Sequence, residues 1–185
     1  MREFILFSRT GRTDSRFHNL REAGRLDVVY QSILMSLFRS HAMRRDVVFH
    51  ALLGGPPNPP LELIVEGEKL RDVRTDENTW EGILRNVLSG REHPGISIRK
   101  NSLQNLIKEK KNIFVLEESG ESINTIDLGT DPVFVLGDQV GLPKKDEDFV
   151  LRYGKKVSIG EKAYLASACI CIINYILDRR ESFSR

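Results

Sequence analysis

Cysteine and histidine are scarce in this 185-residue chain, and neither is spaced for metal binding. The only cysteines, Cys169 and Cys171, lie two residues apart in an apolar helical pattern, which points their side chains about 200° apart. We therefore expect no disulfide between them. The histidines show no metal-ligand spacing either, so we expect no metal site. They are His18, His41, His50 and His93.

Long apolar runs and a strong net charge are also missing. The longest apolar stretch, Ala163–Tyr175, is interrupted by Ser167 and Asn174 and is shorter than the roughly 20 residues that span a membrane. The first residues lack the apolar core of a signal peptide. We expect a soluble, cytoplasmic protein without a membrane partner. Because the formal net charge is only +2, a nucleic-acid partner has to be argued from local clusters of Lys and Arg.

Strand-like and helix-like segments alternate along the chain. Compact apolar or alternating runs predict strands, and apolar residues at i, i+3, i+4 and i+7 predict helices. The strands are expected in "EFILFS", "DVVFHALL", "LELIVEG", "KNIFVLEESG" and "DPVFVLGD". The helices are expected in "LDVVYQSILMSLFRSH", "DENTWEGILRNVLSG", "NSLQNLIKEK" and residues 161–178. This order predicts a single α/β domain over residues 1–185 with a largely parallel sheet, whose ligands bind at the carboxyl ends of the strands.

Two glycine loops stand close together in residues 133–177, "VFVLGDQVGLPKKDEDFVLRYGKKVSIGEKAYLASACICIINYIL". An apolar helix follows them. Each glycine taken alone is explained as the end of a strand. Taken together, the loops suit a ligand that the backbone must approach closely, as an adenosyl group requires. "GDQVG" is not the G-x-G-x-x-G fingerprint of a dinucleotide site.

The order "FVLEESGE", "DPVFVLGDQVGL" and "VSIGEKAYLASACICIINYILDR" resembles the SPOUT class of S-adenosylmethionine-dependent RNA methyltransferases. With "GRLDVVYQSILMSLFRSHAMRRDVVFHALLGGPPNPP" at the N-terminal side, the chain is similar to the archaeal tRNA pseudouridine-54 N1-methyltransferase family. The resemblance implies a C-terminal trefoil knot over about residues 113–185, a homodimer packed through it, and S-adenosylmethionine as cofactor. The knot follows from the resemblance alone, because chains that thread loops are very rare.

The resemblance also assigns cofactor-binding positions. Those that match the family's loops are Leu116, Gly137, Ser158, Ile159, Gly160 and Leu165. Asp138 is expected to face the ribose or the sulfonium. Cys169 and Cys171 are expected to be buried packing residues, with Cys169 also lining the cofactor slot through its backbone. The alternative is that they act as nucleophiles, which would suit methylation at carbon and is not needed for attack by nitrogen.

Methylation of a nitrogen that carries a proton is helped by a carboxylate that accepts this proton. Asp27 in "GRLDV" is the candidate for this catalytic role. The alternative is that Asp27 only caps the N-terminus of the following helix.

Arginines are concentrated in the first quarter of the chain. Arg25, His41, Arg44 and Arg45 are expected to bind the RNA, the last three from an exposed hinge in "RSHAMRRD", with Arg12, Arg16 and Arg21 nearby. The alternative is a solvated surface. Asn58 in "GGPPNPP" is expected on the substrate side.

The sequence therefore predicts methylation of N1 of pseudouridine in the T loop of a tRNA. The alternatives are the same reaction on ribosomal RNA, or a non-catalytic RNA-binding module.

Overall fold

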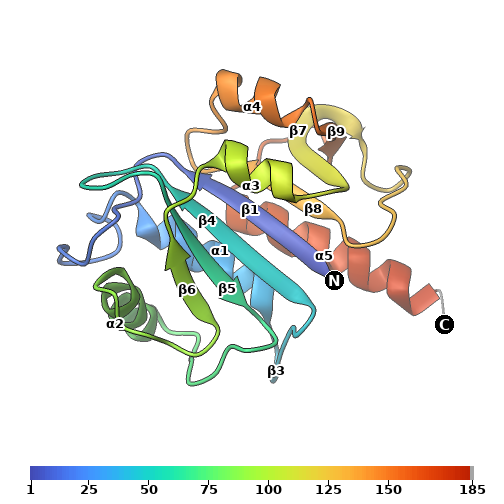
Figure 1. Ribbon diagram of the computed structural model, residues 1–185. Helices are drawn as coiled ribbons and strands as arrows, with labels where there is room; N and C mark the ends of the chain where they lie inside the picture. The colour runs from blue at the N-terminus through green and yellow to red at the C-terminus, as the bar shows by residue number, and fades with distance from the viewer. Residues whose placement is uncertain (184–185) are drawn as a thin grey trace.

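The computed structural model describes residues 1–183, with side chains through residue 181, as an α/β fold around a seven-stranded sheet (Figure 1). The strand order is β6-β5-β4-β1-β8-β7-β9. These strands are β1 (Arg2–Ser8), β4 (Val47–Leu53), β5 (Leu61–Glu66), β6 (Ile96–Arg99), β7 (Ile113–Ser122), β8 (Val133–Gly137) and β9 (Gly154–Ser158). A two-stranded hairpin of β2 (Phe38–Arg39) and β3 (Ala42–Met43) lies apart from the sheet. The predicted α/β class is confirmed.

Six of the seven strands run in the same direction, and only β5 is reversed. β4, β1, β8, β7 and β9 form a continuous parallel part of the sheet, and β5 pairs antiparallel with β4 on one side and with the edge strand β6 on the other. The reversal of β5 relative to β4 has a local cause, because only residues 54–60 connect these two strands, and parallel neighbours need a crossover of a dozen residues or more.

Helices cover both faces of the sheet. α1 (Leu26–Leu37) and α5 (Ala166–Phe183) pack together on one face, where α2 (Glu77–Leu88) also joins the larger apolar core. α3 (Leu103–Glu109) and α4 (Lys144–Val150) cover the other face around a smaller core. The helix ends follow the sequence where a cap is present: Asp76 accepts the N–H of Thr79 at 2.8 Å and Ser102 that of Asn105 at 3.2 Å.

A buried polar network lies on the α3 face of the sheet. His50 is 4% exposed, and its ring nitrogens contact Glu62 Oε1 at 2.7 Å and Glu3 Oε2 at 3.0 Å. The other carboxylate oxygen of Glu62 accepts hydrogen bonds from Arg99 Nε at 2.5 Å and Asn101 Nδ2 at 2.8 Å. Burial alone would raise the pKa of Glu62, but these partners, His50 first, hold its pKa at about 2.

Candidate functional site

A cleft of about 700 Å³ opens at the carboxyl ends of β7 and β8. Its walls come from the outer part of β7, the loop 137–142 after β8, the loop 159–165 after β9 and the first turn of α5. Three segments that are far apart in the sequence meet here because their strands are adjacent and parallel, so their ends lie at one edge. The cleft is at the edge where the sequence placed the ligand.

Seven of the eight predicted cofactor residues line this cleft. They are Leu116, Gly137, Asp138, Ile159, Gly160, Leu165 and Cys169. The eighth, Ser158, is buried below the cleft, where its Oγ contacts both the N–H and the C=O of Gly160 at 3.0 Å. Ser158 therefore shapes the loop, and the structure brings the whole predicted set together.

Asp138 binds protein backbone with both of its carboxylate oxygens. Oδ1 accepts the N–H of Val140 at 2.9 Å, and Oδ2 accepts the N–H of Arg9 at 2.8 Å. The residue is 8% exposed. Its visible role is thus to tie the loop 137–142 to the end of β1, in addition to any contact with a ligand.

The glycines of the cleft differ in what they allow. A Cβ at Gly137 would lie 2.1 Å from the N atom of Leu142, so this glycine permits the tight return of the loop. Gly160 has φ +144° and a Cβ there would meet nothing within 4 Å. The backbone at Gly160 therefore borders open space on the cleft, which fits the close approach of an adenosyl group.

Several cleft residues were missed by the sequence analysis. They are Glu117, Glu118, Gln139, Val140, Lys162 and Tyr164. Burial, and then the charge of Glu147, raises the pKa of Glu117. Glu117 and Glu118 could have been predicted as cleft residues, because they form an acidic pair at the end of the strand predicted in "VLEESG". With Asp138, these acidic side chains outnumber Lys162 in the lining of the cleft, which suits a cationic ligand.

Cys169 is buried, and its Sγ contacts the carbonyl of Tyr164 at 3.6 Å. Burial raises the pKa of its thiol, which disfavours the thiolate that a nucleophile requires. This geometry favours the packing role for Cys169. Cys171 is exposed on the same helix, so its predicted role as a buried packing residue is wrong, because this position lies on the outer face of α5. Both cysteines are free.

Asp27 lies in the first turn of α1, at the same edge of the sheet as the cleft. Arg25 donates two hydrogen bonds to its carboxylate, from Nε to Oδ1 at 2.9 Å and from Nη2 to Oδ2 at 3.0 Å. The hydrogen bonds and the charge of Asp27 raise the pKa of Arg25, and the charge of Asp138 adds to this rise.

The alternative role of Asp27 as a helix cap is wrong. Arg25 occupies the cap position with φ 66°, and no side chain caps the helix there. Because Asp27 is already inside the first turn, its carboxylate binds Arg25 instead.

Asn58 lies at the same edge of the sheet as the cleft, in an exposed loop. Its N–H donates to Thr13 Oγ1 at 2.8 Å, and its carbonyl accepts from Lys100 Nζ at 2.6 Å.

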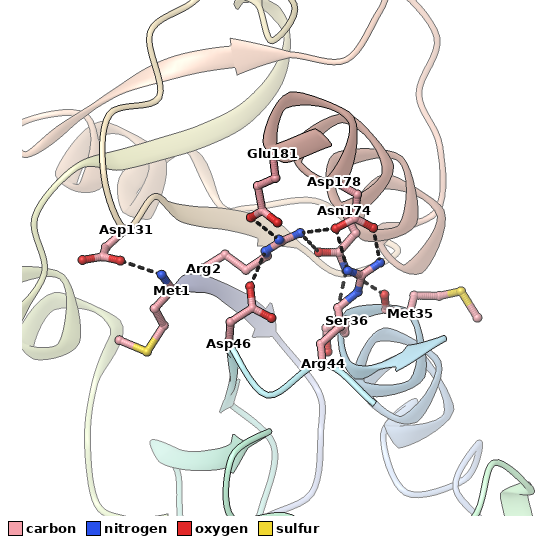
Figure 2. A network of polar contacts seen from close by, with 10 residues as sticks. All are labelled: Met1, Arg2, Met35, Ser36, Arg44, Asp46, Asp131, Asn174, Asp178 and Glu181. Carbon is pink, nitrogen blue, oxygen red and sulfur yellow. Dashed lines mark hydrogen bonds and ion pairs between the residues drawn. The ribbon is translucent and has the colours of Figure 1, made fainter. Parts of the chain in front are cut away.

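The predicted exposed hinge is wrong for Arg44. Arg44 is 9% exposed, and its two terminal nitrogens each bind an oxygen of Asp178 in α5 at 2.7 Å. Arg2 also reaches Asp178, at 3.0 Å, so two guanidinium groups converge on one carboxylate (Figure 2). Asp178 lies 134 residues away in the sequence, a distance over which no local pattern could have predicted the pairing.

His41 and Arg45 are exposed, but they lie with Arg44 before the start of β4, at the amino edge of the sheet. Arg45 Nη1 donates to the carbonyl of Gly67 at 3.0 Å. Of the predicted RNA-binding residues, the structure therefore brings Arg25 and Asn58 to the cleft edge and leaves these three at the opposite edge of the same chain.

Among residues 1–183, no group of three or more His, Cys, Asp or Glu side chains could hold a metal ion. No helix in the same range is long and apolar enough to cross a membrane.

Residues 1–182 match the family described as "Putative SAM-dependent RNA methyltransferase". A tRNA (pseudouridine(54)-N(1))-methyltransferase of Methanocella arvoryzae is 35% identical over 193 residues, which cover 97% of this chain and 100% of that protein. The enzyme of the same name from Methanocaldococcus jannaschii is 34% identical over 202 residues, covering 97% and 98%. The crystal structure of Archaeoglobus fulgidus Nep1 bound to S-adenosylhomocysteine superposes with a TM-score of 0.74 at 13% identity, covering 98% of this chain and 99% of that one. This last likeness concerns the fold.

Proposed function

Because the chain belongs to this family of SAM-dependent RNA methyltransferases, we propose that it methylates N1 of pseudouridine 54 in tRNA. The observation that carries the proposal is the identity of about a third of all positions with relatives of that name, over nearly the whole of both chains. The cleft supports it, since the residues matched to the cofactor loops converge there.

The residues of the cleft fit the cofactor. Leu116, Ile159 and Leu165 offer apolar contacts for an adenine ring, and the bare backbone at Gly160 allows close hydrogen bonding. When bound, S-adenosylmethionine supplies a methyl group on a positively charged sulfur. The acidic side chains of Glu117 and Glu118 line the same cleft and would attract this positive charge.

We assign proton acceptance to Asp27. The N1 nitrogen of pseudouridine carries a hydrogen that must leave as the new N–C bond forms, and a nearby carboxylate can take it. Arg25 holds the Asp27 carboxylate in a fixed orientation with two hydrogen bonds, which restricts its direction at the cleft edge.

The test of this function is a methylation assay on tRNA that carries pseudouridine at position 54. After incubation with S-adenosylmethionine and digestion to nucleosides, mass spectrometry should detect 1-methylpseudouridine. The control tRNA carries uridine at that position and should yield no such product, because the corresponding ring position is a carbon. Equal methylation of both tRNAs would contradict the N1 assignment, and methylation of a ribosomal RNA fragment in place of tRNA would favour the ribosomal alternative.

The C-terminal part is proposed to form a trefoil knot. Membership of the family supports this topology.

A homodimer through α5 is also proposed. One face of this helix packs on α1 through Ile170, Ile173 and Leu177, yet the helix keeps apolar side chains on its outer face. Tyr175 is 59% exposed and Leu165, just before the helix, is 69% exposed. Such a face is stabilised when a second copy covers it.

Tyr175→Glu is expected to convert the dimer into a folded monomer, because the substitution places a charge in the covered face. Light scattering at micromolar concentration should then report half the wild-type mass, with an unchanged circular dichroism spectrum. Tyr153→Glu is the matched control, since Tyr153 is also exposed (45%) but lies after α4. A monomeric wild-type protein under these conditions would refute the dimer.

A further inference from the structure

Arg9 lies where the first strand meets the cleft. β1 ends at Ser8, and the N–H of Arg9 donates to Asp138 Oδ2 at 2.8 Å, in the loop that forms one wall of the cleft. Asp138 is 129 residues away in the sequence, so this junction exists only in the folded chain. The position of Arg9 is thus fixed by the same carboxylate that shapes the cleft wall.

The backbone that follows Arg9 is held tightly. A Cβ at Gly24 would lie 1.7 Å from the carbonyl oxygen of Thr10, and one at Gly55 would lie 2.2 Å from the same atom. Only glycines allow this approach from two sides. The hydroxyl of Thr10 also donates to the carbonyl of Gly24 at 2.9 Å. Because this backbone is constrained, the Cα atom from which the Arg9 side chain extends has a fixed position beside the cleft.

The guanidinium of Arg9 is available, unlike those of Arg12 and Arg25. Arg12 and Arg25 are each held by an aspartate two residues later. Arg9 is exposed and has no carboxylate partner among the side chains of residues 1–181, and its contact with the carbonyl of Gly141 is long, at 3.5 Å. Its donors can therefore be taken by a ligand at the mouth of the cleft without breaking an ion pair.

We propose that Arg9 binds a backbone phosphate of the RNA substrate at the mouth of the cleft and thereby positions the target nucleotide. This inference rests on the proposed function. A base that reacts in a cleft has to leave its stack, and its own phosphate or an adjacent one then lies at the entrance. The planar guanidinium of arginine binds phosphate oxygens in pairs and supplies position without reading the base.

The test compares Arg9→Ala with Arg21→Ala. Arg21 is an equally exposed arginine of the same loop that does not touch the cleft residues. Loss of one charge-assisted phosphate contact should lower kcat/KM for the tRNA by about 10- to 100-fold in Arg9→Ala. The slope of log Kd for tRNA against log salt should fall by about one. Arg21→Ala should change kcat/KM less than about threefold. Arg9→Lys, which keeps the charge but not the paired donors, should lie between wild type and Arg9→Ala.

S-adenosylmethionine affinity and the melting temperature separate this role from a structural one. Both should be unchanged in Arg9→Ala, because the backbone N–H that binds Asp138 is retained. The proposal is overturned if Arg9→Ala matches Arg21→Ala on tRNA, or if cofactor affinity falls as much as tRNA affinity. Failure of the proposed function is recognised separately, as wild-type protein that binds the cofactor but forms no 1-methylpseudouridine.

Discussion

Asp27→Asn is expected to lower the rate of methyl transfer at saturating tRNA by roughly 10²- to 10⁴-fold, the usual contribution of a positioned proton acceptor. The amide has the shape of the carboxylate but accepts a proton poorly. The fold should survive, because Asp27 does not cap α1. Single-turnover kinetics with cofactor and tRNA in excess would measure the chemical step directly.

Asp14→Asn is a closely matched control for this substitution. Arg12 donates two hydrogen bonds to the Asp14 carboxylate, from Nε to Oδ1 at 2.8 Å and from Nη2 to Oδ2 at 2.9 Å. This arrangement repeats that of Arg25 and Asp27. This control should keep nearly the wild-type rate. If Asp27→Asn instead raises KM for tRNA to the same extent as Arg25→Ala and leaves the single-turnover rate intact, then Asp27 only orients Arg25.

Glu62→Ala is expected to reduce the free energy of unfolding by about 3–5 kcal/mol, the cost of removing one partner from a buried ionic network. Glu62 is fully buried, and its loss leaves Arg99, Asn101 and His50 without their shared acceptor. Glu62→Gln should cost less, because its amide can donate to a neutral His50 nitrogen while its carbonyl still accepts from Arg99. Urea denaturation at neutral pH measures both variants.

Glu66→Ala provides the comparison from the same strand. Glu66 is half-buried at the end of β5 and pairs with exposed Lys69 at 2.6 Å, so its loss should cost less than about 1 kcal/mol. Equal losses for Glu62→Ala and Glu66→Ala would contradict the importance of the buried network.

The pH dependence of stability follows from the same network. Folding lowers the pKa of Glu62 from 4.5 to about 2, so its contribution is present above pH 4.5 and is lost as the pH falls toward 2. For His50, burial opposes the charged ring, but Glu3 and Glu62 raise its pKa above 6.5. The His50 contribution is therefore present below pH 6.5 and is lost as the pH rises through the folded-state pKa. In a plot of the free energy of unfolding against pH, Glu62→Ala should therefore lose less stability on the acid side than the wild-type protein does.

Local patterns predicted most of the elements correctly. The spacing of apolar residues in 26–41 predicted a helix, of which residues 26–37 form α1 whereas Phe38–Arg39 form β2. The compact apolar runs predicted β1, β4, β5, β7 and β8. The patterns missed β6, α4 and β9, which are short and rich in charged or polar residues. Such segments carry too few apolar positions to show a period, and their structure comes from the neighbours they pair with or pack on.

Arg25 and Arg44 look alike in the sequence but have different surroundings in the tertiary structure. Both arginines stand in charged stretches around the same predicted helix, and the sequence alone could treat them only as one basic region. α1 runs across the sheet between them, so Arg25 reaches the cleft edge and Arg44 reaches the opposite edge, buried against Asp178.

The residue types, the periodicity and the family motifs by themselves determined the α/β class and the loops that meet at the cleft, because these depend on short-range order and on matched segments. Which charges pair, which arginine is free and which carboxylate holds the cleft wall were decided only by tertiary structure. The physical reason is that polar contacts depend on distances of a few ångströms between groups that the chain brings together from more than 100 residues apart, as in the hydrogen bond from the Arg9 backbone N–H to Asp138 and the ion pair of Arg44 with Asp178.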